Sequence, residues 1–520
     1  MPVKRANILT NSFWYGFELV AETVVTAAMS IAAARVLGPA RLGPFVYLVF
    51  LTSVAGKLGG LGIAEAARRY ISEYLASGQP GVARSVFFAT LRIQCLLAFL
   101  VPAIAIAIAR VLVTPEHFWV AALLIASLGP MLISSISALS NVAAENFARN
   151  VPSALAAAGL YATIVILTLK YDWGILGLAA AVFARRLLEM SIRIVQAMVW
   201  MIRLPKAPTP PGLSRRLVQF SGQAALVTLL TLIVWDRSEV LFLKHFCDVR
   251  QLAYYSVAFS LTEHMLMMPN VIGGAIGAAL MAEFGRGARG VSNLVDTSVR
   301  HLSLIILPVH IGIAAISASL IATLYGAAYL PAIPALAIAA LLSVPKAFYW
   351  LPKTVCQSTE KQGIILRWLL LTGVVNIALD ALLIPRLGAT GAALANGTAQ
   401  GVVVLGMWRS ATRIHPVHVP WRVLLRILSS AAVMGAIVFS FTWTMPPVWG
   451  LAGGIPLGVA TYLAALRFTR AIGKTEVETL AAVADRLPRP AQHLASAVLR
   501  AIAAPGAGNV EKPAAGAVMS

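Results

Sequence analysis

The segment SVFFATLRIQCLLAFLVPAIAIAIA, residues 85–109, is almost entirely apolar. An α-helix rises 1.5 Å per residue, so about 20 such residues cross the hydrocarbon core of a bilayer. Similar runs recur along the whole chain, separated by short polar breaks. They predict an all-α integral membrane protein with about fourteen transmembrane helices, at residues 13–37, 44–66, 85–109, 119–141, 152–169, 174–198, 220–244, 252–280, 300–324, 331–351, 364–384, 389–411, 423–444 and 448–467.

The composition agrees with a membrane protein. Hydrophobic residues make up 59% of the 520 residues and charged residues 12%, whereas a soluble domain has about 25% charged residues. The cysteines Cys95, Cys247 and Cys356 are far apart, and the sequence has no CxxC motif, which excludes a disulfide framework or a zinc site. The first apolar run is too long for a cleaved signal peptide and contains Glu18 and Glu22, so we expect it to remain as the first helix.

The net charge of +21 is distributed unevenly. In a membrane protein, lysine and arginine concentrate in the cytoplasmic loops, so the excess is a topology signal and we expect no nucleic-acid partner. One set of alternating loops holds clusters such as Arg68, Arg69 and Arg84, while the other set holds at most one basic residue per loop, such as Arg41 or Lys170. We therefore expect a multi-pass membrane protein with both termini in the cytoplasm.

A repeat is visible in the two halves of the chain. The sequence GILGLAAA begins at Gly174, and GATGAALA, with the same GxxGxAxA pattern, begins at Gly388. Pro102 and Pro308 show a similar offset of about 210 residues. Small residues are also common packing devices in membrane helices, but agreeing offsets favour a true repeat. Six helices per repeat give halves of parallel topology, and transporters of this kind place the substrate between the halves.

The repeat predicts two six-helix lobes related by a parallel pseudo-twofold axis. The residues between them are rich in proline and basic side chains, which is typical of a linker. The last 50 or so residues combine two amphipathic stretches with a disordered end. The predicted domains are an N-lobe at 1–200, a cytoplasmic linker at 201–217, a C-lobe at 218–412, two further helices at 413–468 and a cytoplasmic tail at 469–520.

Several segments resemble one transporter family. They are ARVLGPARLGPF at 34–45, LGIAEAARRYISEY at 61–74, WDRSEVL at 235–241 and IPRLGATGAALA at 384–395, the last preceded by Asn376 and Asp380. These segments resemble Wzx-type polysaccharide flippases of the multidrug/oligosaccharidyl-lipid/polysaccharide exporter (MOP) superfamily. The resemblance covers roughly residues 8–470. It implies two lobes around a central cavity, two additional C-terminal helices and the flipping of polyprenyl-diphosphate-linked oligosaccharides across the bacterial inner membrane.

Ionisable residues inside the predicted spans are candidate substrate-binding residues, because such residues are costly in a bilayer and are often functional. Lys57 and His264 lie at similar depth in the second and eighth spans and suit a diphosphate, and Arg92 adds a third cationic or protonatable group. Related flippases use cations on these two helices. The alternatives are that Lys57 pairs with an acid (Glu18, Glu22 or Glu65) and that His264 is a packing residue.

Glu18 and Glu22 depart from the lipid II flippases, which carry arginines in the middle of the first helix. This difference speaks against lipid II as the substrate. The two acids remain candidates for binding a proton or sugar hydroxyls, and Trp235 is a candidate for stacking on a sugar.

A second set of polar residues is a candidate coupling-ion site. It consists of Asp236, Asn376, Asp380, Asn396 and Thr398 on the seventh, eleventh and twelfth spans. Carboxylate, amide and hydroxyl oxygens suit a small hard cation, and the lipid II branch has a sodium site of these residue types. The alternative is hydrogen bonding between helices. The sequence predicts no cofactor or other metal, only Na⁺ or H⁺ coupling.

The function expected from these features is that of a flippase and not an enzyme. A drug or metabolite antiporter of the same superfamily is the alternative, although its cavity should be dominated by acids. A polysaccharide polymerase or glycosyltransferase needs catalytic groups on a large loop, and every predicted outer loop is short. A nucleotide-binding loop is missing from the sequence. The expected partners are a lipid-linked oligosaccharide, membrane lipids, and a polymerase and chain-length regulator of the same pathway.

Overall fold

The computed structural model describes residues 8–235, 238–417 and 419–471. Within these ranges every regular element is helical, and nine helical segments are long and apolar enough to cross a membrane. Two of them, α1 (Ile8–Gly59) and α15 (Gln362–Ile414), contain a non-helical glycine, Gly38 and Gly388, where two consecutive helices join. The fold class is therefore confirmed, while the count of fourteen spans stays a prediction. Most of the predicted tail and Asp236 lie outside the described residues.

The chain forms two compact units. The first comprises Met1–Ser256 and Gly373–Ala392, and the second comprises Val257–Thr372 and Ala393–Ser520. The predicted lobe boundaries stay a prediction. The helices of the first unit are α1, α2 (Ile63–Ala76), α3 (Pro80–Leu112), α4 (Phe118–Ala126), α5 (Leu128–Ala143), α6 (Val151–Lys170), α7 (Gly174–Ile202), α8 (Leu213–Trp235), α9 (Glu239–Phe246), the first turns of α10 (Val249–Gly285) and the middle of α15.

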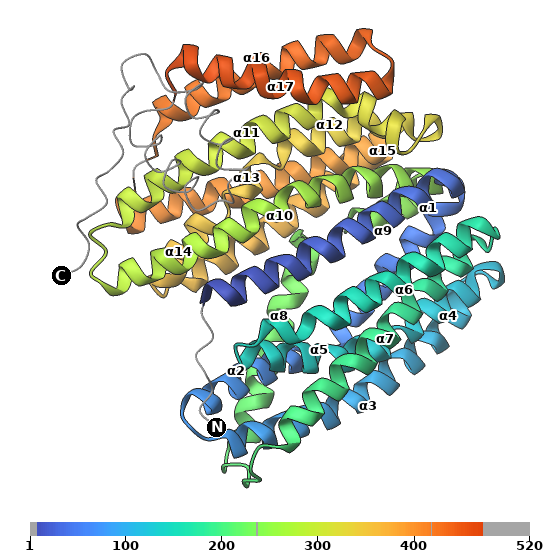
Figure 1. The fold of residues 1–520 in the computed structure, drawn as a ribbon, viewed down its shortest axis with the longest axis vertical. Helices are drawn as coiled ribbons and strands as arrows, with labels where there is room; N and C mark the ends of the chain where they lie inside the picture. Colours follow the sequence, from blue (N-terminus) through green and yellow to red (C-terminus); the bar gives the residue numbers. More distant parts are fainter. Residues whose placement is uncertain (1–7, 236–237, 418, 472–520) are drawn as a thin grey trace. The chain divides into compact units, whose positions relative to one another are not determined.

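In the first unit α6 packs along α7, and α1 packs on α6 (Figure 1). At one end of this unit, a core forms around the fully buried side chains of Ile71, Phe87 and Ile136. The helical contacts bring the predicted loops together in two groups. Arg41 pairs with Asp172 at 3.2 Å in one group, and Arg84 donates to the carbonyl of Leu204 at 2.6 Å in the other. This grouping agrees with the two sets of alternating loops.

The glycines of the GxxGxAxA pattern have equivalent roles in the structure. Gly174 and Gly388 both adopt positive φ, 59° and 55°, which favours glycine over residues with a side chain. Three residues later, a Cβ on Gly177 would lie 2.4 Å from Thr168, and a Cβ on Gly391 would lie 2.5 Å from the Leu383 carbonyl. Each pair therefore makes a tight turn and then a close helix–helix approach, which supports the internal repeat.

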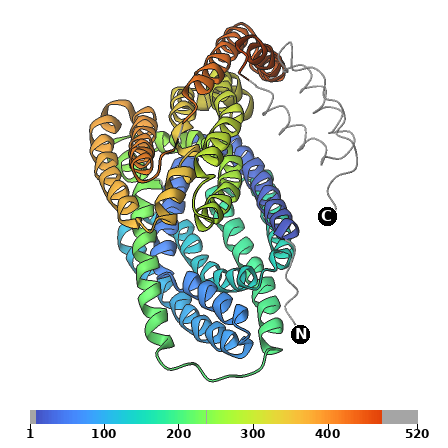
Figure 2. The ribbon, with the colours of Figure 1, turned by 90° about the vertical axis from the view of Figure 1, so that its left-hand side faces the viewer.

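The second unit contains the rest of α10 and α15, together with α11 (Val291–Leu324), α12 (Ile333–Leu342), α13 (Val344–Ala347), α14 (Trp350–Ser358), α16 (Trp421–Thr444) and α17 (Pro447–Thr469). Figures 1 and 2 show α16 and α17 side by side, and both pack on α11. Gly450, Gly454 and Gly458 recur every fourth residue on α17; Gly450 brings it close to Ser319 of α11, and the other two bring it close to α16. Small residues at this spacing allow membrane helices to approach closely.

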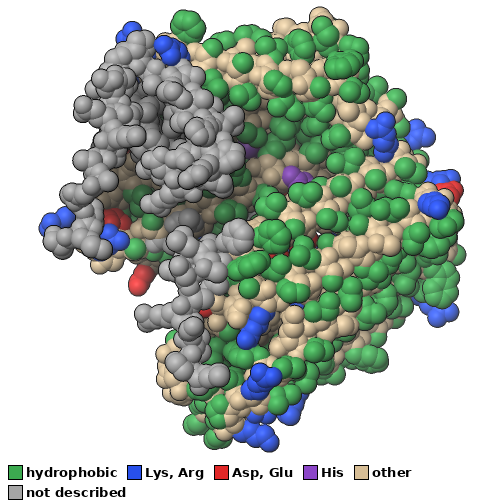
Figure 3. Space-filling model, viewed as in Figure 1, with side chains coloured by type: hydrophobic (Ala, Val, Ile, Leu, Met, Phe, Trp, Pro, Cys, Tyr) green, Lys and Arg blue, Asp and Glu red, His purple; other side chains and the backbone are tan. Residues whose placement is uncertain are grey.

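Large apolar side chains cover the outer surfaces of both units. Phe99 and Val111 on α3 are 73% and 84% exposed, and Trp443 and Phe468 on α16 and α17 are 78% and 88% exposed. Figure 3 shows such hydrophobic side chains over α16 and α17 and over α3 and α4. Contact between such apolar surfaces and water is unfavourable, whereas contact with lipid chains is favourable. The protein is therefore a multi-pass membrane protein.

Candidate functional site

A buried polar cluster lies at the start of α9, in the first unit. Glu239, Asn376 and Asp380 are fully buried there. Asn376 Nδ2 lies 3.1 Å from Ser238 Oγ, 3.2 Å from Glu239 Oε1 and 3.3 Å from Asp380 Oδ2. The Tyr255 hydroxyl donates to Glu239 Oε2 at 2.8 Å. Since an amide nitrogen has only two hydrogens, it cannot satisfy three acceptors at once.

The cluster contains oxygen atoms that can accept further hydrogen bonds. Asn376 Oδ1 and Asp380 Oδ1 are buried and accept no hydrogen bond from any described residue. Two buried carboxylates close to one amide are costly while both are charged. Oxygen ligands and excess negative charge are what a small hard cation or a proton needs. The geometry therefore fits a coupling-ion site, which stays a prediction.

The other predicted coupling residues are not among the described residues of the first unit. Asn396 and Thr398 belong to the second unit, where Asn396 Oδ1 accepts a hydrogen bond from Gln400 Nε2 at 2.7 Å and Thr398 is exposed. Asp236 lies outside the described residues. The sequence prediction missed Glu239, although it follows Asp236 by only three residues within the same predicted span.

Two arginines of α7 hold the acids of α1. Glu18 Oε1 accepts from Arg193 Nη2 at 3.0 Å, and Glu22 pairs with Arg185. Arg193 also contacts Glu189 at 2.6 Å and the hydroxyl of Ser153 at 3.0 Å. Buried charges are normally paired in this way, because an unpaired charge is expensive away from water. The two acids of α1 are therefore parts of an ion-pair network within the membrane-spanning helices.

The predicted cations of the first unit both lie on exposed helix faces. Lys57 is exposed in the last turn of α1, and Arg92 is exposed on α3, next to Ile93 and one turn before Leu96. Glu65, one possible partner of Lys57, is 2.9 Å from Arg68. The backbone of Trp235 ends α8, but its side chain lies outside the described part of the chain.

In the second unit His264 is half-buried on α10, and its Nδ1 lies within hydrogen-bond distance of the Ser260 carbonyl of the preceding turn. The adjacent Glu263 pairs with Lys346 at 2.5 Å. Six residues after His264, Asn270 Oδ1 accepts a hydrogen bond from the Trp350 indole at 3.1 Å. α10 thus presents several polar groups to α13 and α14, and the sequence prediction missed Lys346.

A family model described as polysaccharide biosynthesis protein matches residues 32–334, which is more than half of the chain. The chain belongs to the polysaccharide biosynthesis protein family. This confirms the resemblance to polysaccharide flippases at the level of the family. A search of curated protein sequences found no match for this family member.

Solved structures establish the fold of this family member. The lipid II flippase MurJ in an inward closed conformation matches with a TM-score of 0.69 and 14% identity, over 88% of this chain and 98% of MurJ. An inward-facing multidrug resistance MATE family transporter of the MOP superfamily matches with a TM-score of 0.64 and 14% identity, over 76% and 95% of the two chains. A MOP superfamily transporter from Pyrococcus furiosus matches with a TM-score of 0.57 and 16% identity, over 78% of this chain and 95% of that transporter. The polysaccharide biosynthesis family member therefore has the MOP superfamily fold.

Proposed function

We propose that this protein is a flippase that moves polyprenyl-diphosphate-linked oligosaccharides across the bacterial inner membrane by alternating access. Its products would serve the synthesis of O-antigen, capsule or exopolysaccharide. One observation carries the proposal: a polysaccharide biosynthesis family member has the fold of a lipid-linked-precursor flippase over 88% of its length. The polysaccharide itself is hydrophilic, so its lipid-linked precursor needs a polar path through the bilayer.

Charged and protonatable side chains within the spans supply groups for such a path. Lys57, Arg92 and His264 would donate hydrogen bonds to the diphosphate, because charge-assisted bonds to phosphate oxygens are the strongest of their kind. Trp235 would stack on a sugar ring. Glu18 and Glu22, held by α7 arginines, would contribute mainly to the position of α1.

The buried cluster would couple transport to an ion. Na⁺ or H⁺ binding to Glu239, Asn376 and Asp380, together with Asp236, would offset the negative charge. An ion that binds one cavity orientation more tightly shifts the equilibrium toward that orientation. The sequence contains no nucleotide-binding loop that could supply energy instead.

Reconstitution tests the proposal. The purified protein is placed in liposomes that contain a fluorescent short-chain polyprenyl-diphosphate oligosaccharide in both leaflets, and a membrane-impermeant periodate solution oxidises the outer glycans. We expect the protein to raise the oxidised fraction from about half toward completion. Liposomes without protein and liposomes with a fluorescent phosphatidylglycerol, whose headgroup diol periodate also cleaves, are the controls. An unchanged oxidised fraction, with uptake of a cationic dye in exchange for sodium, would identify an antiporter instead.

A further inference from the structure

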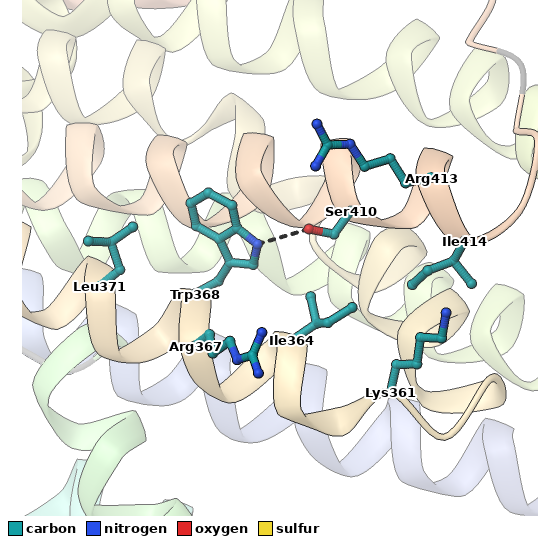
Figure 4. Close-up of a pocket in the computed structure, with 8 residues that line it drawn as sticks. All are labelled: Lys361, Ile364, Arg367, Trp368, Leu371, Ser410, Arg413 and Ile414. Carbon is teal, nitrogen blue, oxygen red and sulfur yellow. Dashed lines mark hydrogen bonds between the residues drawn. The ribbon is translucent and has the colours of Figure 1, made fainter.

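Residues from the two legs of α15 line an open pocket of about 460 Å³ in the second unit, called the cavity below. It lies where the first leg begins and the second leg ends, so it is at one end of the helical hairpin that turns at Gly388. Its lining residues are Lys361, Ile364, Arg367, Trp368, Leu371, Ser410, Arg413 and Ile414 (Figure 4). The transport proposal uses none of these residues.

Trp368 forms a fixed wall of this cavity. Its indole Nε1 donates to Ser410 Oγ at 3.0 Å, and Ser410 Oγ donates to the Gly406 carbonyl at 2.9 Å. A Cβ on Gly406 would lie 2.4 Å from the indole ring, so only a glycine lets the ring lie this close to the second leg. Tryptophan favours the membrane–water interface, where its ring is in apolar surroundings and its N–H meets a polar partner.

Three cationic side chains line the same cavity as Trp368. Lys361 precedes the first turn of α15, Arg367 lies in its second turn, and Arg413 lies in its last turn. Within the described part of the chain, none of the three forms an ion pair, and the residues that line the cavity include no acid. Three cations around one cavity, with no acid among its lining residues, attract an anion, and the arginine fork matches a phosphate in particular.

The apolar side of the cavity indicates that this anion is attached to a lipid. Leu371 lines the cavity and is 48% exposed, and the apolar residues Leu370 and Val374 of the same leg are 49% and 68% exposed. A ligand that places a phosphate among the cations would therefore lay hydrocarbon along this leg. Basic pockets between membrane helices are known to hold anionic headgroups in this way.

We propose that this cavity binds the phosphate headgroup of an anionic membrane phospholipid, with Lys361, Arg367 and Arg413 as phosphate ligands and Trp368 as its wall. The cavity is large enough for a glycerol phosphodiester group. The proposed site shares no residue with those assigned to the transport path, and the proposal does not depend on the identity of the transported substrate.

The test is lipid retention by the full-length protein. Wild-type protein is extracted from vesicles of equal parts phosphatidylglycerol and phosphatidylcholine, delipidated stepwise, and its retained lipids are measured by native mass spectrometry. We expect phosphatidylglycerol to be retained about tenfold over phosphatidylcholine, and this preference to disappear in the variant K361Q/R367Q/R413Q. The control R203Q/K206Q/R215Q removes the same charge from exposed residues outside the cavity and should keep the preference.

A second pair of variants tests the wall without changing charge. Gly406→Ala should displace the indole and lower retention, whereas Gly401→Ala, where an added Cβ meets open space, should not. Equal retention by wild type and the cavity variants, or equal loss in the control variants, would overturn the proposal. Two competitions identify the source of the phosphate. Displacement by millimolar inorganic phosphate would show a free-anion site, and selective displacement by a polyprenyl diphosphate would show a substrate site; either result rejects a phospholipid site.

Discussion

Arg193 of α7 and Glu18 of α1 form a 3.0 Å ion pair, and each side chain is at most 13% exposed. The pair joins two helices of the first unit that are 175 positions apart in sequence. Arg193 also neutralises Glu189. A single guanidinium thus serves two carboxylates within the spans.

Removing this guanidinium should destabilise the protein. Arg193→Ala removes the positive charge that pairs with Glu18 and Glu189. Breaking a buried ion pair lowers the free energy of unfolding by about 3 kcal/mol. We expect a clear drop in the temperature at which half of the folded protein is lost. This temperature is measured from the size-exclusion peak that remains after heating in detergent. Arg41→Ala is the matched control, because its partner Asp172 and Arg41 itself are more than half exposed and such pairs contribute about 0–1 kcal/mol. Equal effects of the two variants would contradict a structural role for the network.

Lys57→Ala should abolish oligosaccharide flipping while the protein remains abundant in the membrane. Lys57→Arg should retain part of the rate, since it keeps the charge with a different geometry. The liposome assay described above measures both. Lys170→Ala, which removes an exposed cation at the end of α6, serves as the control. Normal flipping by Lys57→Ala would reject a role in substrate binding, and loss of the protein itself would show a structural role.

The buried cluster should confer ion dependence on the flipping rate. If Na⁺ binds there, an inward sodium gradient changes the rate of the wild type, and both Asp380→Asn and Glu239→Gln remove that response by removing a carboxylate charge. Asp248→Asn changes an exposed acid and should leave the response intact. A rate that follows a pH gradient and ignores sodium would assign a proton to the site. Indifference to both ions would mean that the cluster only joins helices.

The topology prediction can be checked by cysteine labelling, but not with the native residues, since Cys356 is fully buried. We suggest Ser77→Cys and Glu116→Cys, two exposed positions in consecutive loops, in a variant without native cysteines. A membrane-impermeant maleimide added to intact cells should label position 116 only, because the lysine and arginine bias places residue 77 in the cytoplasm. Labelling of residue 77 alone would invert the topology.

The sequence predicted features that depend on local periodicity. Apolar runs gave the helices, the glycine pattern gave two equivalent turns, and the four-residue spacing of Asn376 and Asp380 placed these side chains in contact. It did not predict contacts made by distant segments. The pairing of Glu18 with Arg193 depends on how α1 crosses α7, and the wall formed by Trp368 and Ser410 depends on the turn at Gly388. Hydropathy has no information on either, because it treats each helix alone.

The ion pairs between α1 and α7 have a consequence for biosynthesis. α7 contains Arg185, Arg186 and Arg193, and each arginine at the centre of an isolated helix costs about 2.5–3.5 kcal/mol on insertion. α7 is accordingly not among the nine segments that are apolar enough to cross a membrane by themselves in the described chain. α1 leaves the ribosome more than 100 residues earlier and carries the complementary acids. We therefore expect stable insertion of α7 to depend on α1 remaining near the translocon until α7 arrives, so that the two helices enter the bilayer as a pair.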